Sequence, residues 1–208
     1  MEEYLRPTED IDCENPKIKE TASDITRGIE GEAERGKAIF YFVRDEIKYD
    51  YYAPLLPLRA SATLERRRGF CIQKAVLLVA LARAAGIPAR LGFAKIRNHL
   101  LPERILKLQK GIDILTPHGF AELYIEGAWV KATPAFDLET CRKWNFIPVE
   151  FDGRNDALLH PRSREGRRHI EYLHFYGSFA DVPHEMIIDL VTRTYGRDYL
   201  EAWMRGFR

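Results

Sequence analysis

The chain has 208 residues, of which 46% are hydrophobic and 30% charged, and its formal net charge is +1. This length and balance predict one soluble globular domain, and the near-neutral charge gives no general attraction to nucleic acid or an acidic membrane. No apolar run reaches the roughly 18 residues of a membrane span, and residues 1–16 lack the basic start and apolar centre of a secretion signal. We therefore expect a cytoplasmic protein without nucleic-acid or membrane partners.

In chain order, residues 1–20 read as a polar lead-in, and residues 17–50 read as helical, with an apolar face around Ile39 and Val43. A proline-containing loop follows. Residues 71–85 contain neither Gly nor Pro and are apolar around almost the whole circumference, which predicts a buried central helix. Gly86 and Pro88 are typical of its C-terminal end.

The second half predicts a strand over 87–96, a mixed and partly helical connection over 98–117, and then two more strands. These strands cover 118–126 and 128–136, with Gly127 at the hairpin turn between them. Residues 138–168 read as irregular, an aromatic cluster occupies 172–179, and residues 183–207 read as helical. This order predicts an α+β fold. We expect a single domain over 1–208, with a core at about 36–138 and an extension at about 139–208.

The chemistry concentrates on Cys71, at the start of the central helix. Free N–H groups and the helix dipole favour a thiolate there, although a lone cysteine entering an apolar helix is more often structural. His118 strengthens the catalytic interpretation, because it starts a strand between Pro117 and Gly119 and could face a cleft. A distant Cys and His are what a thiol acyl-transfer site requires, with imidazole moving the proton.

No metal or cofactor is predicted. Cys13, Cys71 and Cys141 form no CxxC pair, and the histidines show neither HExxH nor zinc spacing. Glycine-rich nucleotide-binding motifs and a calcium loop of the EF-hand pattern are also missing from the sequence.

Two segments carry a family resemblance. The run GFCIQKAVLLVALARAAGIPARLGFA resembles the nucleophile helix of transglutaminase-like proteins, and HGFAELYIEGAWVKATPAF resembles the signature that follows it in that superfamily. The resemblance implies a papain-like core, in which a helix with the Cys packs on an antiparallel sheet with the His and Asp. It also implies acyl-enzyme chemistry on amide bonds, with extra helices here at both ends of the core.

The third site position departs from the family. The usual residue before the proline is Asp, whereas Thr133 precedes Pro134 in this chain. A threonine hydroxyl can hold an imidazole but cannot stabilise its charged form as a carboxylate does. We predict Asp137 as the orienting acid, with Thr133 as the alternative, and we expect Trp129 to pack near the site.

The leading hypothesis is a cysteine hydrolase or acyltransferase acting on a peptide, protein or small amide. Cys71 would form a thioester, and His118 would act as acid and base. Water as the acceptor gives a protease or amidase, and an amine gives a transglutaminase. The alternative is a catalytically decayed peptide- or protein-binding module on the same fold. The sequence does not indicate an oligomeric state.

Overall fold

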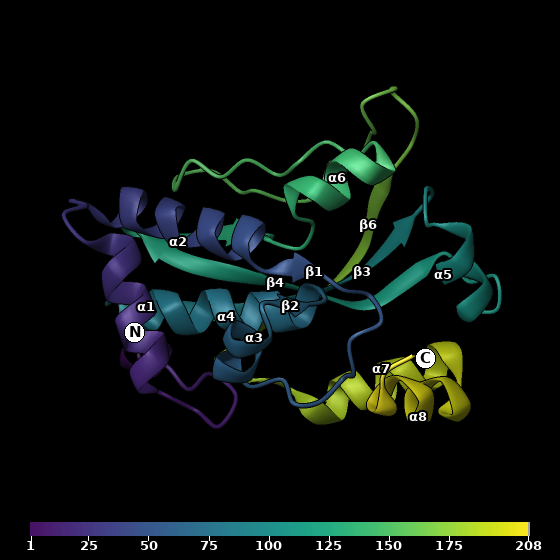
Figure 1. Ribbon diagram of the computed structural model, residues 1–208, viewed down its shortest axis with the longest axis horizontal. Coiled ribbons are helices and arrows are strands. Elements are labelled where there is room, and N and C mark those ends of the chain that lie inside the picture. Colours follow the sequence, from purple (N-terminus) through teal and green to yellow (C-terminus); the bar gives the residue numbers. More distant parts are fainter. Residues whose placement is uncertain (208) are drawn as a thin grey trace.

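A computed structural model describes residues 1–207 and shows a four-stranded antiparallel sheet surrounded by helices (Figure 1). The strand order is β5–β4–β3–β6. The strands cover β3 (Ala89–Asn98), β4 (Ile114–Ile125), β5 (Ala128–Ala132) and β6 (Ile170–Phe179). The predicted class is confirmed, because the helix that carries Cys71 packs on this sheet.

That helix, α4 (Cys71–Ala84), is the centre of the core. Every residue from Ile72 to Arg83 is buried, as expected for a helix that is apolar all round. The helices α1 (Pro16–Thr26), α2 (Glu32–Glu46) and α3 (Ala60–Arg66) pack around it (Figure 1). The stretch 17–50, predicted as helical, contains two helices, separated by a turn in which Gly28 and Gly31 both have positive φ.

The hairpin of β4 and β5 positions the second half of the site. Its register pairs Ala121 with Ala132, and Glu126 and Gly127 adopt the positive φ that a tight two-residue turn requires. On its other side β4 pairs with β3, where His118 lies opposite Ala94. The predicted hairpin is correct, but β4 begins at Ile114, four residues earlier than expected.

The sequence did not predict β6. The aromatic cluster at 172–179 lies on this strand, which pairs with β3 through two register shifts. Such irregularities break the two-residue period of a strand, so no clear alternation marks it in the sequence. The remaining short elements are a 3-10 turn, two helices and two strands. They cover Glu2–Tyr4, α5 (Glu103–Leu108), α6 (Leu138–Trp144), β1 (Lys48–Tyr49) and β2 (Arg68–Gly69).

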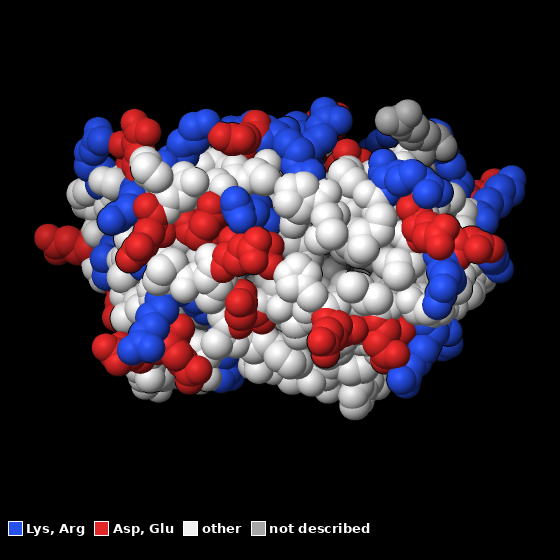
Figure 2. Space-filling model, turned by 90° about the horizontal axis from the view of Figure 1, so that it is seen from below, with Lys and Arg blue, Asp and Glu red and all other residues white. Residues whose placement is uncertain are grey.

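The chain ends in α7 (His184–Tyr195) and α8 (Arg197–Arg205), which Gly196 separates with φ 91°. Both helices lie at the bottom of Figure 1. Figure 2 shows the molecule from that side, where an uncharged area in the middle is surrounded by acidic and basic residues. None of the helices within residues 1–207 is long and apolar enough to cross a membrane.

Candidate active site

Cys71 is the first residue of α4, and β4 approaches it closely. A Cβ added to Gly119 of β4 would lie 2.9 Å from the Ile72 Cα, so only glycine allows this approach without a shift of the backbone. The backbone N–H groups of Gly119, Ile72 and Cys71 itself lie near enough to the sulfur to lower the pKa of Cys71. The start of α4 and the strand that carries His118 therefore meet at the thiol.

Cys71 is partly exposed in this structure, although neighbouring groups still shield its sulfur. Burial raises the pKa of Cys71 to about 11, against the opposing effect of the backbone N–H groups of Gly119, Ile72 and Cys71. A thiolate requires either a nearby positive charge or access to water. The sulfur is therefore a neutral thiol at physiological pH while this arrangement persists.

His118 is also neutral here. Its side chain lies in the interior, with 2% of the residue exposed, and burial lowers its pKa to about 3. The ring atom Nε2 is buried and has no hydrogen-bond partner within residues 1–207. A buried polar atom without a partner costs free energy and calls for an explanation. This nitrogen is therefore open to a hydrogen-bond partner that the described residues do not supply.

Thr133 directly follows the last residue of β5, so its position continues the register beyond the pair of Ala121 and Ala132. Extended by one step, that register places it opposite Phe120, on the same sheet face as His118. Its hydroxyl is buried without a hydrogen bond within the described chain, although it lies close to the hydroxyl of Tyr172. Two orphaned polar atoms, the Thr133 Oγ1 and the His118 Nε2, thus belong to the same region of the sheet.

The ring of Tyr172 stands edge-on to His118, with their centroids 6.2 Å apart. Its hydroxyl accepts a hydrogen bond from the Leu159 N–H at 3.3 Å, and burial raises its pKa to about 12. Tyr172 is therefore a neutral hydroxyl that lies beside both the imidazole and Thr133.

The carboxylate of Asp137 is held by backbone N–H groups. Its carboxylate accepts hydrogen bonds from the Tyr49 N–H at 2.6 Å and from the Thr140 N–H at 2.9 Å, and it caps the start of α6. Although burial acts to raise its pKa, these N–H groups and the charge of Lys74 bring it below the ordinary value. Within residues 1–207 no hydrogen bond joins Asp137 to His118, so its role as the orienting acid stays a prediction that none of its contacts supports.

Lys74 lies one helical turn after Cys71 and is fully buried. Its ammonium donates to the carbonyls of Arg44 and Ile47, at 3.0 and 2.5 Å. These carbonyls belong to the C-terminal end of α2 and have no partner within that helix. Burial lowers the pKa of Lys74 to about 7, against the charge of Asp137. The lysine therefore joins α2 to α4 behind the site.

An aromatic pocket surrounds the thiol. It is lined by Cys71, by neighbours of His118 on β4 and by six aromatic side chains from three parts of the chain. These side chains are Tyr49, Tyr51, Phe70, Tyr195, Tyr199 and Trp203. The last three come from α7 and α8, so the C-terminal helices cover Cys71. The free space that remains is about 40 Å³, which suits one or two water molecules.

Several hydrogen bonds hold the covering helices α7 and α8, which we call the helix cover, against the rest of the protein. Tyr195 donates to the Ile114 carbonyl at 2.7 Å and accepts from the Thr116 N–H at 3.1 Å. The hydroxyls of Tyr51 and Tyr199 bind each other at 2.7 Å. The carbonyl of Trp203 accepts from the Leu55 N–H at 2.9 Å. In contrast, the indole Nε1 of Trp203 is buried and finds no partner in the described chain.

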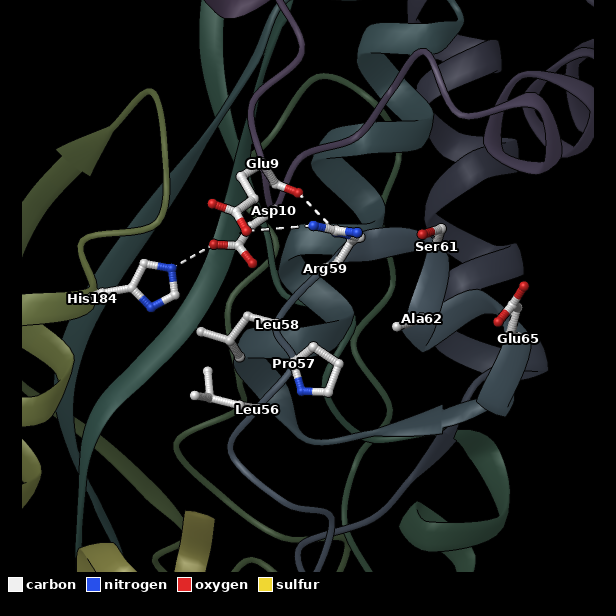
Figure 3. A pocket seen from close by; sticks show the side chains of 10 residues that line it. All are labelled: Glu9, Asp10, Leu56, Pro57, Leu58, Arg59, Ser61, Ala62, Glu65 and His184. Carbon is white, nitrogen blue, oxygen red and sulfur yellow. Dashed lines mark hydrogen bonds and ion pairs between the residues drawn. The ribbon is translucent and has the colours of Figure 1, made fainter. Parts of the chain in front are cut away.

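A wider hollow of about 510 Å³ lies away from the thiol, between the N-terminal lead-in, the loop before α3 and the start of α7 (Figure 3). His184 faces Asp10 across it, and Arg59 binds Glu9. Cys71 and His118 do not line this hollow. Its contacts instead fasten α7 to the lead-in.

The sequence analysis missed the three aromatic residues of the cover. Tyr199 and Trp203 lie four residues apart on α8, a helical spacing that places them on one face and that could have been read in the sequence. Tyr195 is the last residue of α7. Trp129, which we expected near the site, packs instead against Tyr4 and beneath Arg90.

Comparisons with known proteins bear on the same region. The sequence profile described as Transglutaminase-like superfamily matches residues 19–134. The chain belongs to the transglutaminase-like superfamily. That match includes Cys71, His118 and Thr133. Asp137 and the covering helices α7 and α8 lie after it.

Two solved structures of other proteins are similar to this chain. A Cytophaga hutchinsonii protein described as a "putative cysteine protease" is 19% identical, with a TM-score of 0.52 over 84% of this chain and 52% of its own. This chain thus spans about half the length of that protein. The periplasmic domain of TgpA from Pseudomonas aeruginosa is 21% identical, with a TM-score of 0.46 over 63% of this chain and 45% of its own. No curated protein matches the sequence.

Proposed function

We propose that this transglutaminase-like chain is a cysteine-dependent acyl-transfer enzyme that acts at amide bonds. The observation that carries the proposal is the close contact of β4 with the start of α4, where a Cβ on Gly119, the residue next to His118, would lie 2.9 Å from the Ile72 Cα. This contact joins a helix N-terminus, a thiol and the strand that presents an imidazole. These are the parts that thiol acyl transfer needs.

In the proposed reaction the imidazole of His118 accepts the thiol proton, and the sulfur of Cys71 attacks the amide carbonyl carbon. The C–N bond breaks as His118 returns the proton to the leaving amine, and a thioester remains on Cys71. The N–H of Cys71, at the start of α4, is a donor for the developing oxyanion. Water or an amine then attacks the thioester and releases the thiol.

His118 becomes an efficient base only when its environment changes. The neutral pair seen here, with a raised thiol pKa and a lowered imidazole pKa, results from burial. Movement of α8 would admit water and substrate, and both pKa values would then return toward their ordinary range. We therefore propose that this structure is a covered resting form.

Turnover of p-nitrophenyl acetate tests the function. We expect repeated release of nitrophenol, no turnover in Cys71→Ala, and a loss of roughly 100-fold or more in His118→Gln. His174→Gln is the matched control, because His174 is exposed on β6. An added primary amine that captures the acyl group would indicate transglutaminase-type transfer, whereas insensitivity to the amine would indicate hydrolysis.

The second candidate is a peptide- or protein-binding module that has lost catalysis. The observation that favours it is the pair of orphaned atoms, since Thr133 stands in the third position and the His118 Nε2 lacks a partner. Under this candidate Cys71 would react with the ester no faster than a free thiol, and His118→Gln would change nothing.

A further inference from the structure

The pocket beside Cys71 differs from its surroundings in charge. None of its ten lining residues is ionised at neutral pH, and six of them are aromatic. A neighbouring hollow shares Tyr49 and Tyr51 as a wall, yet it is lined by ionisable residues that include Lys48, Arg68 and Glu139. Ionisable residues thus line the hollow on one side of Tyr49 and Tyr51, whereas the pocket on the side of Cys71 has no charged lining residue.

The position of the pocket relative to the imidazole indicates which part of a substrate it would hold. Thr116 and Pro117, just before His118 on β4, line the pocket, but His118 itself does not. The leaving amine must lie against the imidazole that protonates it. The pocket therefore lies on the acyl side of the scissile bond, where the group that stays on the sulfur binds.

Most polar groups of the pocket wall form hydrogen bonds within the protein. The hydroxyls of Tyr51 and Tyr199 bind each other, and that of Tyr195 binds the backbone of β4. Trp203 is the exception, because the residue is 9% exposed while its indole N–H is buried without a partner in the described chain. The wall thus presents aromatic side chains, and one of them, Trp203, carries an N–H donor without a partner in the described chain.

We infer that Cys71 takes uncharged acyl groups with an aromatic or branched apolar end, which bind between Leu115 and the aromatic side chains of α8. This inference rests on the proposed acyl-transfer function and names its substrate class. Burial of an apolar group there is favourable, whereas a carboxylate or ammonium would lose its hydration without gaining a partner. The Trp203 N–H supplies a hydrogen bond to one acceptor of the bound group.

The pocket must widen before such a group can enter. Its free space of about 40 Å³ is well below the roughly 150 Å³ of a cavity that holds benzene. We expect the side chains of α8 to move, because Cys71 and Leu115 in the opposite wall belong to α4 and β4 and pack against the core. Entry of the acyl group is therefore coupled to displacement of Trp203 and Tyr199.

A series of p-nitrophenyl esters with one leaving group tests the acyl side alone. We compare the phenylacetyl, isovaleryl and hemisuccinyl esters, and measure Cys71 acylation from the nitrophenol burst and the mapped adduct. Each rate is divided by the rate with N-acetylcysteine, which removes the intrinsic reactivity of the ester. We expect the phenylacetyl and isovaleryl groups to exceed the charged hemisuccinyl group by roughly 10- to 100-fold.

Two variants with matched controls test whether the preference for apolar acyl groups arises in this pocket. Leu115→Lys places a charge in the pocket and should shift the ratio toward hemisuccinate, while Leu56→Lys, at an exposed leucine outside the pocket, should not. Trp203→Phe keeps a ring but removes the donor, and it should slow phenylacetyl transfer by about 2- to 10-fold. Trp129→Phe is its control.

The results of these experiments distinguish a wrong substrate class from a wrong proposed function. If Cys71 is acylated in a His118-dependent way at equal normalised rates for all three esters, the function stands and the substrate class is wrong. The same holds if hemisuccinate is preferred. If no ester acylates Cys71 faster than N-acetylcysteine, both fail.

Discussion

At the scale of single residues, the site is defined by groups that have lost contact with water and have not gained a partner. The His118 Nε2 and the Thr133 Oγ1 are both buried without a hydrogen bond in the described chain. A carboxylate at position 133 would give the imidazole an acceptor and stabilise its protonated form. We therefore expect His118 to be a weaker base with Thr133 than with an acidic residue at this position.

Thr133→Asp should restore that acceptor. We expect the pKa of His118 to rise and Cys71 acylation by p-nitrophenyl acetate to increase at least about tenfold. Thr133→Asn, of similar size but uncharged, is the matched control and should not increase the rate. Burst kinetics measure both variants, and NMR titration of the imidazole measures the pKa. No gain in Thr133→Asp over Thr133→Asn would mean that position 133 does not serve His118.

Gly119→Ala tests the close approach of β4 to α4. The new Cβ would meet the Ile72 backbone at 2.9 Å, so we expect a loss of about 1–3 kcal/mol in the free energy of unfolding, together with slower acylation. Gly36→Ala is a useful contrast, because its nearest contact is the flexible end of Ile125 and its helical position favours alanine. Urea unfolding of both variants checks the prediction. Equal stability would show that β4 can move away from the thiol at little cost.

At the scale of elements, α4 was predictable because a short helix that is apolar on all sides is expected to be buried. The hairpin at Gly127 was predictable from its turn. The position of the helices that cover Cys71 was not predictable, because the sequence around Tyr195, Tyr199 and Trp203 does not indicate which surface these side chains pack on. The same reason applies to β6, whose register shifts erase the strand period, and to Asp137, whose carboxylate is bound by an N–H that lies 88 residues away.

The cover depends on the break between α7 and α8 at Gly196, where φ is 91°. Gly196→Ala meets no atom within 4 Å, but side chains rarely adopt this backbone conformation, which costs about 1–3 kcal/mol. We expect α8 to loosen and Cys71 to react several-fold faster with iodoacetamide at pH 8. Peptide mapping distinguishes Cys71 from Cys13 and Cys141.

Gly166→Ala is the control, because Gly166 also has positive φ but lies in the loop before β6. Its backbone strain should lower stability without changing the Cys71 labelling rate. Labelling that rises equally in both variants would point to general loosening, and labelling that rises in neither would show that α8 does not limit access to the thiol.

At the scale of the whole molecule, the buried histidines connect the site to acid stability. The pKa of His118 is lowered by burial from 6.5 to about 3, and that of His169 to about 4. Between these values and pH 6.5 the unfolded chain binds protons that the native chain does not. The free energy of unfolding therefore falls as the pH drops through this window.

We expect this loss to approach roughly 1.4 kcal/mol per pH unit for each histidine. His118→Gln and His169→Gln should each flatten the dependence between pH 6.5 and 4, whereas His174→Gln, at an exposed site, should leave it unchanged. Urea unfolding at several pH values measures the slope. A native slope retained in both buried-site variants would show that neither imidazole is held neutral by the fold.

The proposed function requires that the sulfur of Cys71 becomes acylated and that this acylation depends on His118. The most direct measurement quenches the protein in acid soon after mixing with p-nitrophenyl acetate, and then locates the acetyl group by peptide mass spectrometry. We expect one acetyl group on Cys71 in the native protein, little in His118→Gln at the same time point, and none on Cys13 or Cys141. Acetylation spread over the cysteines, or equal on Cys71 with and without His118, would contradict it.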